Sequence, residues 1–139
     1  MKISSRFTIA LHILCLLKND PSYLCSSTSL AKSVNCNPVI IRRILLCLKK
    51  SGIVHIEKDK RGARLLKEPK FITLLDVYHS VDVIEKNKLF SFHKSPNPLC
   101  PVGASIQTVL ELILIQTQER MEESLQNVTL QQVVSSLNI

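Results

Sequence analysis

The sequence has few of the residues that several common classes of functional site require. It contains no tryptophan, and aromatic residues make up 4% of its 139 residues. Proteins that bind RNA or single strands usually stack bases on aromatic side chains, so this scarcity argues against such a platform. The sequence also has no G-x-G-x-x-G, P-loop, G-x-S-x-G or H-E-x-x-H motif, and its four histidines are scattered. We therefore do not expect an enzyme.

Cysteines are present, but not in a pattern that forms disulfides or binds zinc. None of the five belongs to a C-x-x-C pair, and an odd number without such pairs fits neither a disulfide framework nor a zinc ribbon. We expect most of them to behave as small hydrophobic residues in a reducing cytosol. The apolar run "FTIALHILCLL" is too short to cross a bilayer, and the "KNDP" that follows it is no signal-peptide cleavage pattern. These features predict a cytoplasmic protein.

Positive charge is concentrated in the first half of the chain. The formal net charge of the whole sequence is +7. Residues 1–70 contain fourteen Lys and Arg against four Asp and Glu, a net charge of +10, whereas residues 71–139 contain four against seven, a net charge of −3. A basic half attracts a polyanion such as nucleic acid or an anionic membrane, and an acidic half attracts neither. A basic surface without any partner is the alternative.

Three helices are predicted in the basic half, over residues 5–18, 26–34 and 38–50. The second and third are separated only by a tight turn, "NCN". Asn37 is a good N-cap for the third helix, and Pro38 suits its first position, where a missing N–H costs nothing. A short helix, a tight turn and a second helix are the plan of a helix-turn-helix.

The third helix is amphipathic, and its spacing decides which way its arginines point. One stripe at i, i+3, i+4 and i+7 contains Ile41, Ile44, Leu45 and Leu48. Val39, Arg42 and Arg43 fall on the opposite face and are expected to point away from the core. An outward basic helix after a tight turn is typical of a recognition helix that enters the major groove. A solvated charged face is the alternative for the two arginines.

A small β-hairpin is predicted directly after the third helix. The stretch "IVHIEKDKRGARLL" contains two short β patterns, over residues 53–58 and 63–66, around a basic tip with Gly62. A hairpin attached to a helix-turn-helix is a winged helix, so residues 53–67 would be the wing. A cationic wing can follow the sugar-phosphate backbone or enter the minor groove.

The second half of the chain is predicted to be helical. Thr73 would cap a helix, a proline-rich loop follows, and a long helix extends from Ser105 to about Gln126, with a final short helix capped by Thr129. The middle of the long helix, "VLELILI", is apolar on nearly every side. We expect one side to pack on residues 5–18 and another on the same helix of a second subunit, giving a two-fold dimer. A long helix folded wholly into its own domain is the alternative.

The predicted fold class is mainly α with a small β-hairpin wing. Residues 1–70 would form a winged helix-turn-helix DNA-binding domain. Residues 71–139 would form a helical dimerisation and sensing region, with its long C-terminal dimerisation helix.

Four stretches of the sequence together resemble the bacterial Rrf family of winged-helix transcription regulators. They are "MKISSRFTIALHIL", "NPVIIRRILLCLKKSGIV", "RGARLLKEPKFITLLDVYHSV" and "NPLCPVGASIQTVLE". The family includes the iron-sulphur cluster regulator, the nitric-oxide-sensing repressor and the cysteine-metabolism repressor. The resemblance implies a homodimeric, sequence-specific DNA-binding regulator, generally a repressor, that acts on a palindromic operator. A winged-helix adaptor that binds another protein, with weak DNA binding, is the alternative function.

The resemblance also implies which residues contact double-stranded DNA. The residues expected to touch phosphates are Lys2, Ser27 and Thr28. Those expected to reach base edges are Asn37, Pro38, Val39, Arg42 and Arg43, with an arginine bidentate to guanine as the specific contact. Those expected on the wing, in or over the minor groove, are Lys60, Arg61 and Arg64.

The sensing loop departs from the family pattern. Cluster-binding members carry three closely spaced cysteines before the long helix, because an iron–sulphur cluster requires thiolates, whereas this chain has only Cys100 there. We predict no cluster, no other cofactor and no metal, since His79 and His93 have no tight ligand spacing with Cys100. Cys100 is a candidate redox sensor, because the positive end of the long helix would lower the pKa of its thiol. An inert packed thiol is the alternative.

Overall fold

The computed structural model describes residues 5–19, 25–57, 62–82 and 89–137. The helices are α1 (Ser5–Asn19), α2 (Ser27–Val34), α3 (Pro38–Lys50), the 3₁₀ turn η1 (Pro69–Phe71), α4 (Leu74–Val81), α5 (Pro101–Gln126) and α6 (Leu130–Ser136). The strands are β1 (Cys25–Ser26), β2 (Val54–Glu57) and β3 (Gly62–Leu65). The predicted fold class, a mainly helical chain with a β-hairpin wing, is confirmed.

The helix-turn-helix forms through local hydrogen bonds at the turn between α2 and α3. Asn35 takes the left-handed conformation with φ of 61°, which ends α2. The backbone N–H of Cys36 then donates to the carbonyl oxygen of Ala31 over 3.1 Å. The Asn37 side chain accepts from the Val39 N–H over 2.9 Å and caps α3, which begins with proline as predicted. The direction of α3 is therefore set within a few residues of the turn.

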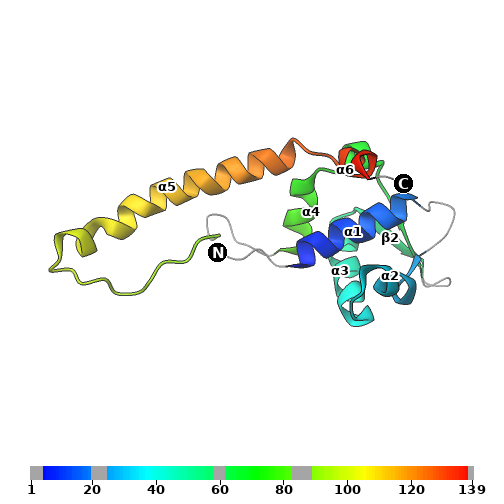
Figure 1. The fold of residues 1–139 in the computed structure, drawn as a ribbon, viewed down its shortest axis with the longest axis horizontal. Helices are drawn as coiled ribbons and strands as arrows, with labels where there is room; N and C mark the ends of the chain where they lie inside the picture. Colours follow the sequence, from blue (N-terminus) through cyan, green and yellow to red (C-terminus); the bar gives the residue numbers. More distant parts are fainter. Residues whose placement is uncertain (1–4, 20–24, 58–61, 83–88, 138–139) are drawn as a thin grey trace.

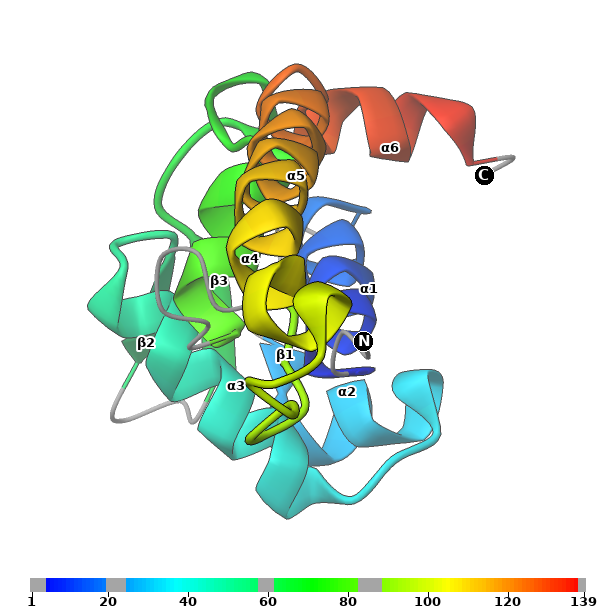
Figure 2. The ribbon, with the colours of Figure 1, turned by 90° about the vertical axis from the view of Figure 1, so that its left-hand side faces the viewer.

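The core of the domain surrounds α1, which contacts α2, α3, α4, α6 and β3. Figure 2, viewed nearly along α5, places α1 among these elements. The predicted stripe of α3 faces this core, and its four residues, Ile41, Ile44, Leu45 and Leu48, are at most 5% exposed. Complete burial of such a side chain stabilises by roughly 1.5–3 kcal/mol. This stripe holds α3 with its opposite face outward, as the sequence predicted.

The sheet has three strands rather than the two of the predicted hairpin. Its order is β1-β3-β2, and both pairings are antiparallel. In β1, Cys25 pairs with Ala63 and Ser26 with Gly62, so the chain entering α2 is hydrogen-bonded to the wing. The base of the wing is thereby fixed to the start of the helix-turn-helix.

The helices α4 and α6 both begin with a capping box, at the two threonines predicted to cap them. Thr73 and Asp76 bond reciprocally at the start of α4, and Thr129 and Gln132 do so at the start of α6. Backbone bonds from Leu74 to Val128 (2.9 Å) and from Leu130 to Ile72 (2.7 Å) hold α6 beside η1 and α4. The chain after α5 therefore returns to the domain.

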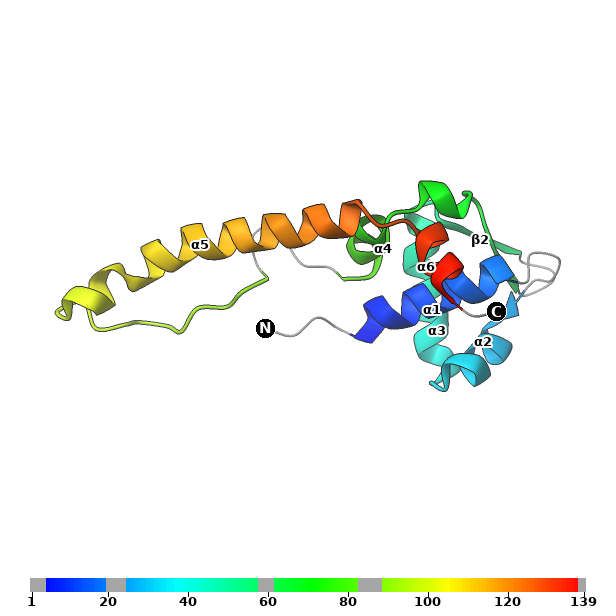
Figure 3. The same cartoon turned by 45° about the horizontal axis from the view of Figure 1, so that its top comes forward.

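Helix α5 begins at Pro101, four residues before the predicted start, and packs on α4. We expected one side of this helix to pack on residues 5–18, but in the described residues its packing partner is α4, and α1 packs on α4 and α6. The rest of α5 projects from the domain, and the segment before it runs alongside (Figures 1 and 3). The Ser80 hydroxyl on α4 also donates to the Cys47 carbonyl oxygen on α3 over 3.0 Å, which connects α3 to the element that carries α5. In the described part of the chain, no helix is long and apolar enough to cross a membrane.

Candidate nucleic-acid interface

The outward face of α3 is the most strongly basic described surface of the helix-turn-helix. The helix has four cationic residues and no acidic one. Arg42 and Arg43 are both exposed, and within the described ranges neither is paired with a carboxylate. Two exposed cations on a helix whose orientation is fixed give this face a positive charge that favours an anionic partner.

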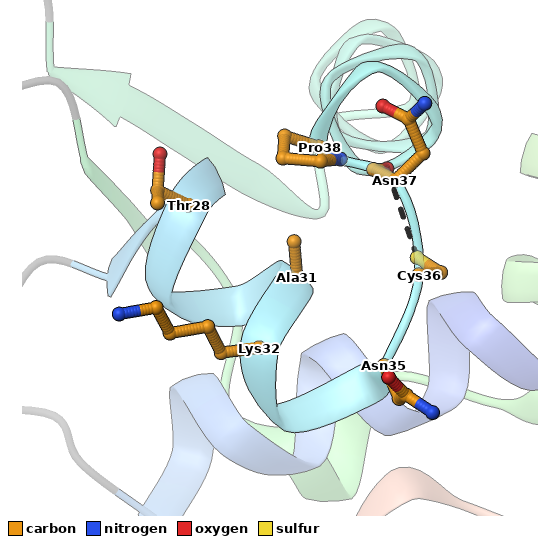
Figure 4. A pocket seen from close by; sticks show the side chains of 7 residues that line it. All are labelled: Thr28, Ala31, Lys32, Asn35, Cys36, Asn37 and Pro38. Atoms are coloured by element: carbon orange, nitrogen blue, oxygen red, sulfur yellow. Dashed lines mark hydrogen bonds between the residues drawn. The ribbon is translucent and has the colours of Figure 1, made fainter.

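A hollow of about 610 Å³ lies at the turn, beside the start of α3 (Figure 4). Its lining residues are Thr28, Ala31, Lys32, Asn35, Cys36, Asn37 and Pro38. The half-buried Cys36 thiol donates to the Asn37 carbonyl oxygen over 3.8 Å, drawn as the dashed line in the figure. The turn therefore adds a concave surface, lined by both polar and apolar side chains, next to the outward face of α3.

A second groove, of about 480 Å³, separates α3 from the wing. Three of its lining residues, Ser26, Ser27 and Thr28, come from the start of α2. The others, from α3 and the two wing strands, are Arg42, Leu45, Leu46, Ile56, Glu57, Gly62 and Ala63. The structure thus brings the predicted phosphate contacts Ser27 and Thr28 to the same groove as Arg42. A helix N-terminus beside an arginine favours an anionic group.

The wing contains a cluster of three polar side chains, His55, Glu57 and Arg64, that the sequence analysis missed. The β2–β3 register places His55 opposite Arg64. The Glu57 Oε1 atom lies 3.2 Å from His55 Nε2 and 3.8 Å from Arg64 Nε. Strand alternation in "VHIE" puts the histidine and the glutamate on one face. This alternation is the sequence signal from which their proximity could have been predicted. Arg64, a predicted minor-groove residue, therefore has a carboxylate partner within its own wing.

Other predicted contacts lie in different places. Lys2, Lys60 and Arg61 lie outside the described residues. Asn37 and Pro38 form the cap and first position of α3, and Val39 follows them on the exposed face. The described members of the predicted set on α2 and α3 thus lie around one continuous region, with Arg64 on the adjoining wing.

Cys100 lies far from this region, at the N-cap position of α5. Its thiol is exposed, so the packed thiol considered as the alternative is absent from the single subunit. The Asn97 backbone oxygen accepts from the Cys100 N–H over 3.2 Å, and the Asn97 side chain accepts from the Leu99 N–H over 3.0 Å. Cys15 differs, because its burial raises the pKa of its thiol. Burial of a thiol disfavours the thiolate, which is its reactive form.

The donor set of this subunit does not fit an iron–sulphur cluster. Residues 83–105 contain a single cysteine, Cys100, whereas a cluster is held mainly by thiolates. Across the ranges with described coordinates, no three His, Cys, Asp or Glu side chains are grouped closely enough to hold a metal ion. His79 and His93 are therefore not brought together with Cys100.

Comparisons with known proteins agree with this geometry. The family model Rrf2, "Iron-dependent Transcriptional regulator", matches residues 3–136. A Bacillus subtilis (strain 168) protein named "Putative HTH-type transcriptional regulator YwnA" is 41% identical over 135 residues, covering 97% of this chain and 98% of its own.

Solved structures share the fold over nearly the whole chain. A crystal structure of "a putative DNA binding protein" is 36% identical with a TM-score of 0.73, and the match covers 93% of this chain and 98% of that one. CymR, the global cysteine regulator of B. subtilis, has the same fold at 19% identity and a TM-score of 0.73, with 99% of each chain covered. The family likeness predicted from the sequence is confirmed, and the chain belongs to the Rrf2 family of transcriptional regulators.

Proposed function

We propose that this chain is a homodimeric transcription repressor that binds a palindromic DNA operator in the cytoplasm. The observation that carries the proposal is the orientation of α3. Its apolar stripe is buried, and Arg42 and Arg43 are exposed on the face that remains. A helix of 13 residues is about 20 Å long and fits the major groove.

The groove between α3 and the wing supports the same binding mode. Ser27 and Thr28 at the start of α2 supply hydroxyls and backbone N–H groups where a phosphate of the DNA backbone would pass. On the wing, Glu57 would compete with DNA for Arg64, which weakens any minor-groove contact of that side chain. Base recognition therefore falls mainly to α3.

The homodimer is proposed from an apolar stripe on the projecting part of α5. Val102, Ile106, Val109 and Ile113 follow the spacing i, i+4, i+7 and i+11, which puts them on one side of the helix. Within the subunit Val102 is 67% exposed and Val109 53% exposed. Phe90 and Phe92 from the preceding segment line a small pocket together with Leu114 and Ile115, on another side of α5. The uncovered stripe would pack against the same stripe of a second copy. Apolar residues spaced by four, three and four positions are typical of a helix that packs along another helix.

A two-fold dimer built on α5 would present two α3 helices to one face of DNA. Recognition helices of such dimers enter successive major grooves about 34–36 Å apart, which explains why the operator would be palindromic.

Because the chain lacks the set of cysteines that holds an iron–sulphur cluster, a regulatory signal would act on this dimer through a different group. We propose the exposed Cys100 thiol at the start of α5, whose oxidation by a peroxide to a sulfenic acid would alter the dimer helix.

Selection of DNA by the purified, reduced protein tests the proposed function. A random duplex library is bound at physiological salt, and the enriched sequences are read. We expect one inverted repeat, lost with the double variant Arg42→Ala/Arg43→Ala and retained with the control Arg120→Ala, which removes an exposed arginine on α5. Enrichment of no sequence by the wild type would contradict the proposal. A stable protein partner captured independently of DNA would then favour an adaptor.

For the sensor, the selection is repeated after mild peroxide treatment. We expect the enrichment to fall for the wild type and to persist for Cys100→Ser. An equal fall in both proteins would exclude Cys100 as the sensor. The proposal that the reduced protein binds DNA would still stand.

A further inference from the structure

The outward face of α3 also carries apolar side chains that contacts to phosphate and guanine do not explain. Val39 is 43% exposed and Leu46 is 51% exposed. They are seven residues apart, so at about 100° per residue they differ in direction by only ~20° and lie about 10.5 Å apart along the axis. The two side chains form one row along the helix.

Arg42 and Arg43 lie on the two sides of this row. Relative to Val39, a helical projection places Arg42 about 60° to one side and Arg43 about 40° to the other. Arg42 and Leu46 also line the groove between α3 and the wing, together with the apolar residue Ile56. The row therefore occupies the centre of the outward face, where the helix would approach the floor of the major groove most closely.

Single exposed apolar residues are common on protein surfaces and need no explanation. An aligned pair between two unpaired arginines is a different arrangement, since it divides one face into an apolar centre and cationic edges. Major-groove base edges offer one matching apolar group, the 5-methyl group of thymine, beside the acceptors of guanine. The charge pattern of the face and the chemistry of the groove are complementary.

We propose that Val39 and Leu46 contact the 5-methyl groups of two thymines in each half-site. The inference rests on the proposed function, because it requires α3 to lie in the major groove. With ~3.4 Å between successive bases, a separation of about 10.5 Å corresponds to thymines about three base pairs apart. These residues would select A·T pairs at positions adjoining those where the arginines select guanine.

Replacement of thymine by deoxyuridine tests the inference, since it removes only the methyl group and preserves base pairing. After the operator has been selected, each thymine of one half-site is replaced in turn, and the dissociation constant is measured by fluorescence anisotropy. For wild-type protein we expect about a fourfold loss at each of two positions, because burying one carbon contributes roughly 0.8 kcal/mol.

The variants assign each methyl group to a side chain. Leu46→Ala should lose sensitivity to deoxyuridine at one position and keep it at the other, and Val39→Ala should show the reverse. Leu66→Ala is the matched control, because Leu66 is also 51% exposed but lies just after the wing strand β3. This control should keep both sensitivities. Both test positions are exposed, so thermal unfolding should confirm that the variants fold normally.

Two results would overturn the inference while leaving DNA recognition by α3 in place. One is a wild-type affinity that does not change with deoxyuridine at any position. The other is a methyl dependence that persists unchanged in both Leu46→Ala and Val39→Ala. If the wild type enriches no sequence in the first selection, the proposed function itself fails, and the methyl inference fails with it.

Discussion

Replacement of the apolar stripe on α5 should convert the proposed dimer to a monomer without unfolding the subunit. The double variant Val109→Gln/Ile113→Gln removes two apolar side chains that are 53% and 52% exposed in the subunit. Glutamine is a good helix former, so α5 should remain helical. Their exposure means that the domain itself gains little from them. Most of their contribution would come from the second copy.

The expected magnitude follows from the surface that the subunit leaves uncovered. Full burial of a valine or isoleucine contributes roughly 1.5–3 kcal/mol, so covering the remaining half contributes about 0.8–1.5 kcal/mol per side chain. A symmetric dimer contains each residue twice, and the four side chains then account for roughly 3–6 kcal/mol of association. That corresponds to a dimer dissociation constant about 10²–10⁴-fold higher.

Sedimentation equilibrium across a wide concentration range measures this change directly. The wild type should have twice the subunit mass of 15.7 kDa at micromolar concentration, and the double variant should have the subunit mass. Ala104→Gln is the control, because Ala104 is exposed on nearly the opposite side of α5. A double variant that remains dimeric with unchanged affinity, or a wild type that is monomeric throughout, would refute the assignment of the interface.

Three further substitutions test local parts of the structure by urea unfolding. Gly103→Ala should destabilise by about 1–3 kcal/mol, because a Cβ there would collide with the Asn97 backbone oxygen; an unchanged stability would show that this turn can move away freely. Thr73→Ala should cost about 0.5–2 kcal/mol through loss of the α4 cap, and no loss would mean that the capping box contributes nothing. Burial raises the pKa of the Asp82 carboxyl, and Arg6 partly opposes that rise. The folded state therefore holds the Asp82 proton more tightly than the unfolded chain, and this stabilisation is lost as pH rises above the ordinary value of 3.8 through the raised pKa. The free energy of unfolding of Asp82→Asn relative to wild type should increase over that pH range, and a constant difference would contradict the shift.

Local signals in the sequence predicted the helix-turn-helix well. A cap residue followed by proline predicted the start of α3, and four apolar residues at helical spacing predicted its buried face. The outward direction of Arg42 and Arg43 followed from that face alone, because a helix that buries one stripe must expose the opposite one. These are short-range effects, so a single sequence contains them.

The elements that the sequence missed depend on pairing between distant segments. Strand β1 has only two residues, too few for a recognisable alternation, and it exists because β3 lies beside it. The contact of Arg64 with Glu57 likewise depends on the register of two strands. The middle of α5, "VLELILI", is apolar on nearly every side, so its pattern could not distinguish packing on α4 from packing on α1. Its early start at Pro101 was obscured by neighbouring prolines, although proline is favourable at a first helical position.

The central claim is that α3 reads base edges, and the affinity of Arg43→Ala for a set of single-base variants of the selected operator tests it most directly. If Arg43 is bidentate to a guanine, the variant should lose about 1–3 kcal/mol on the operator. It should also no longer discriminate among bases at one position of each half-site, while its discrimination elsewhere remains that of the wild type. Equal weakening on every duplex, with discrimination intact at all positions, would show that Arg43 contacts only phosphate. The same result for Arg42→Ala would contradict base reading by the arginines of α3.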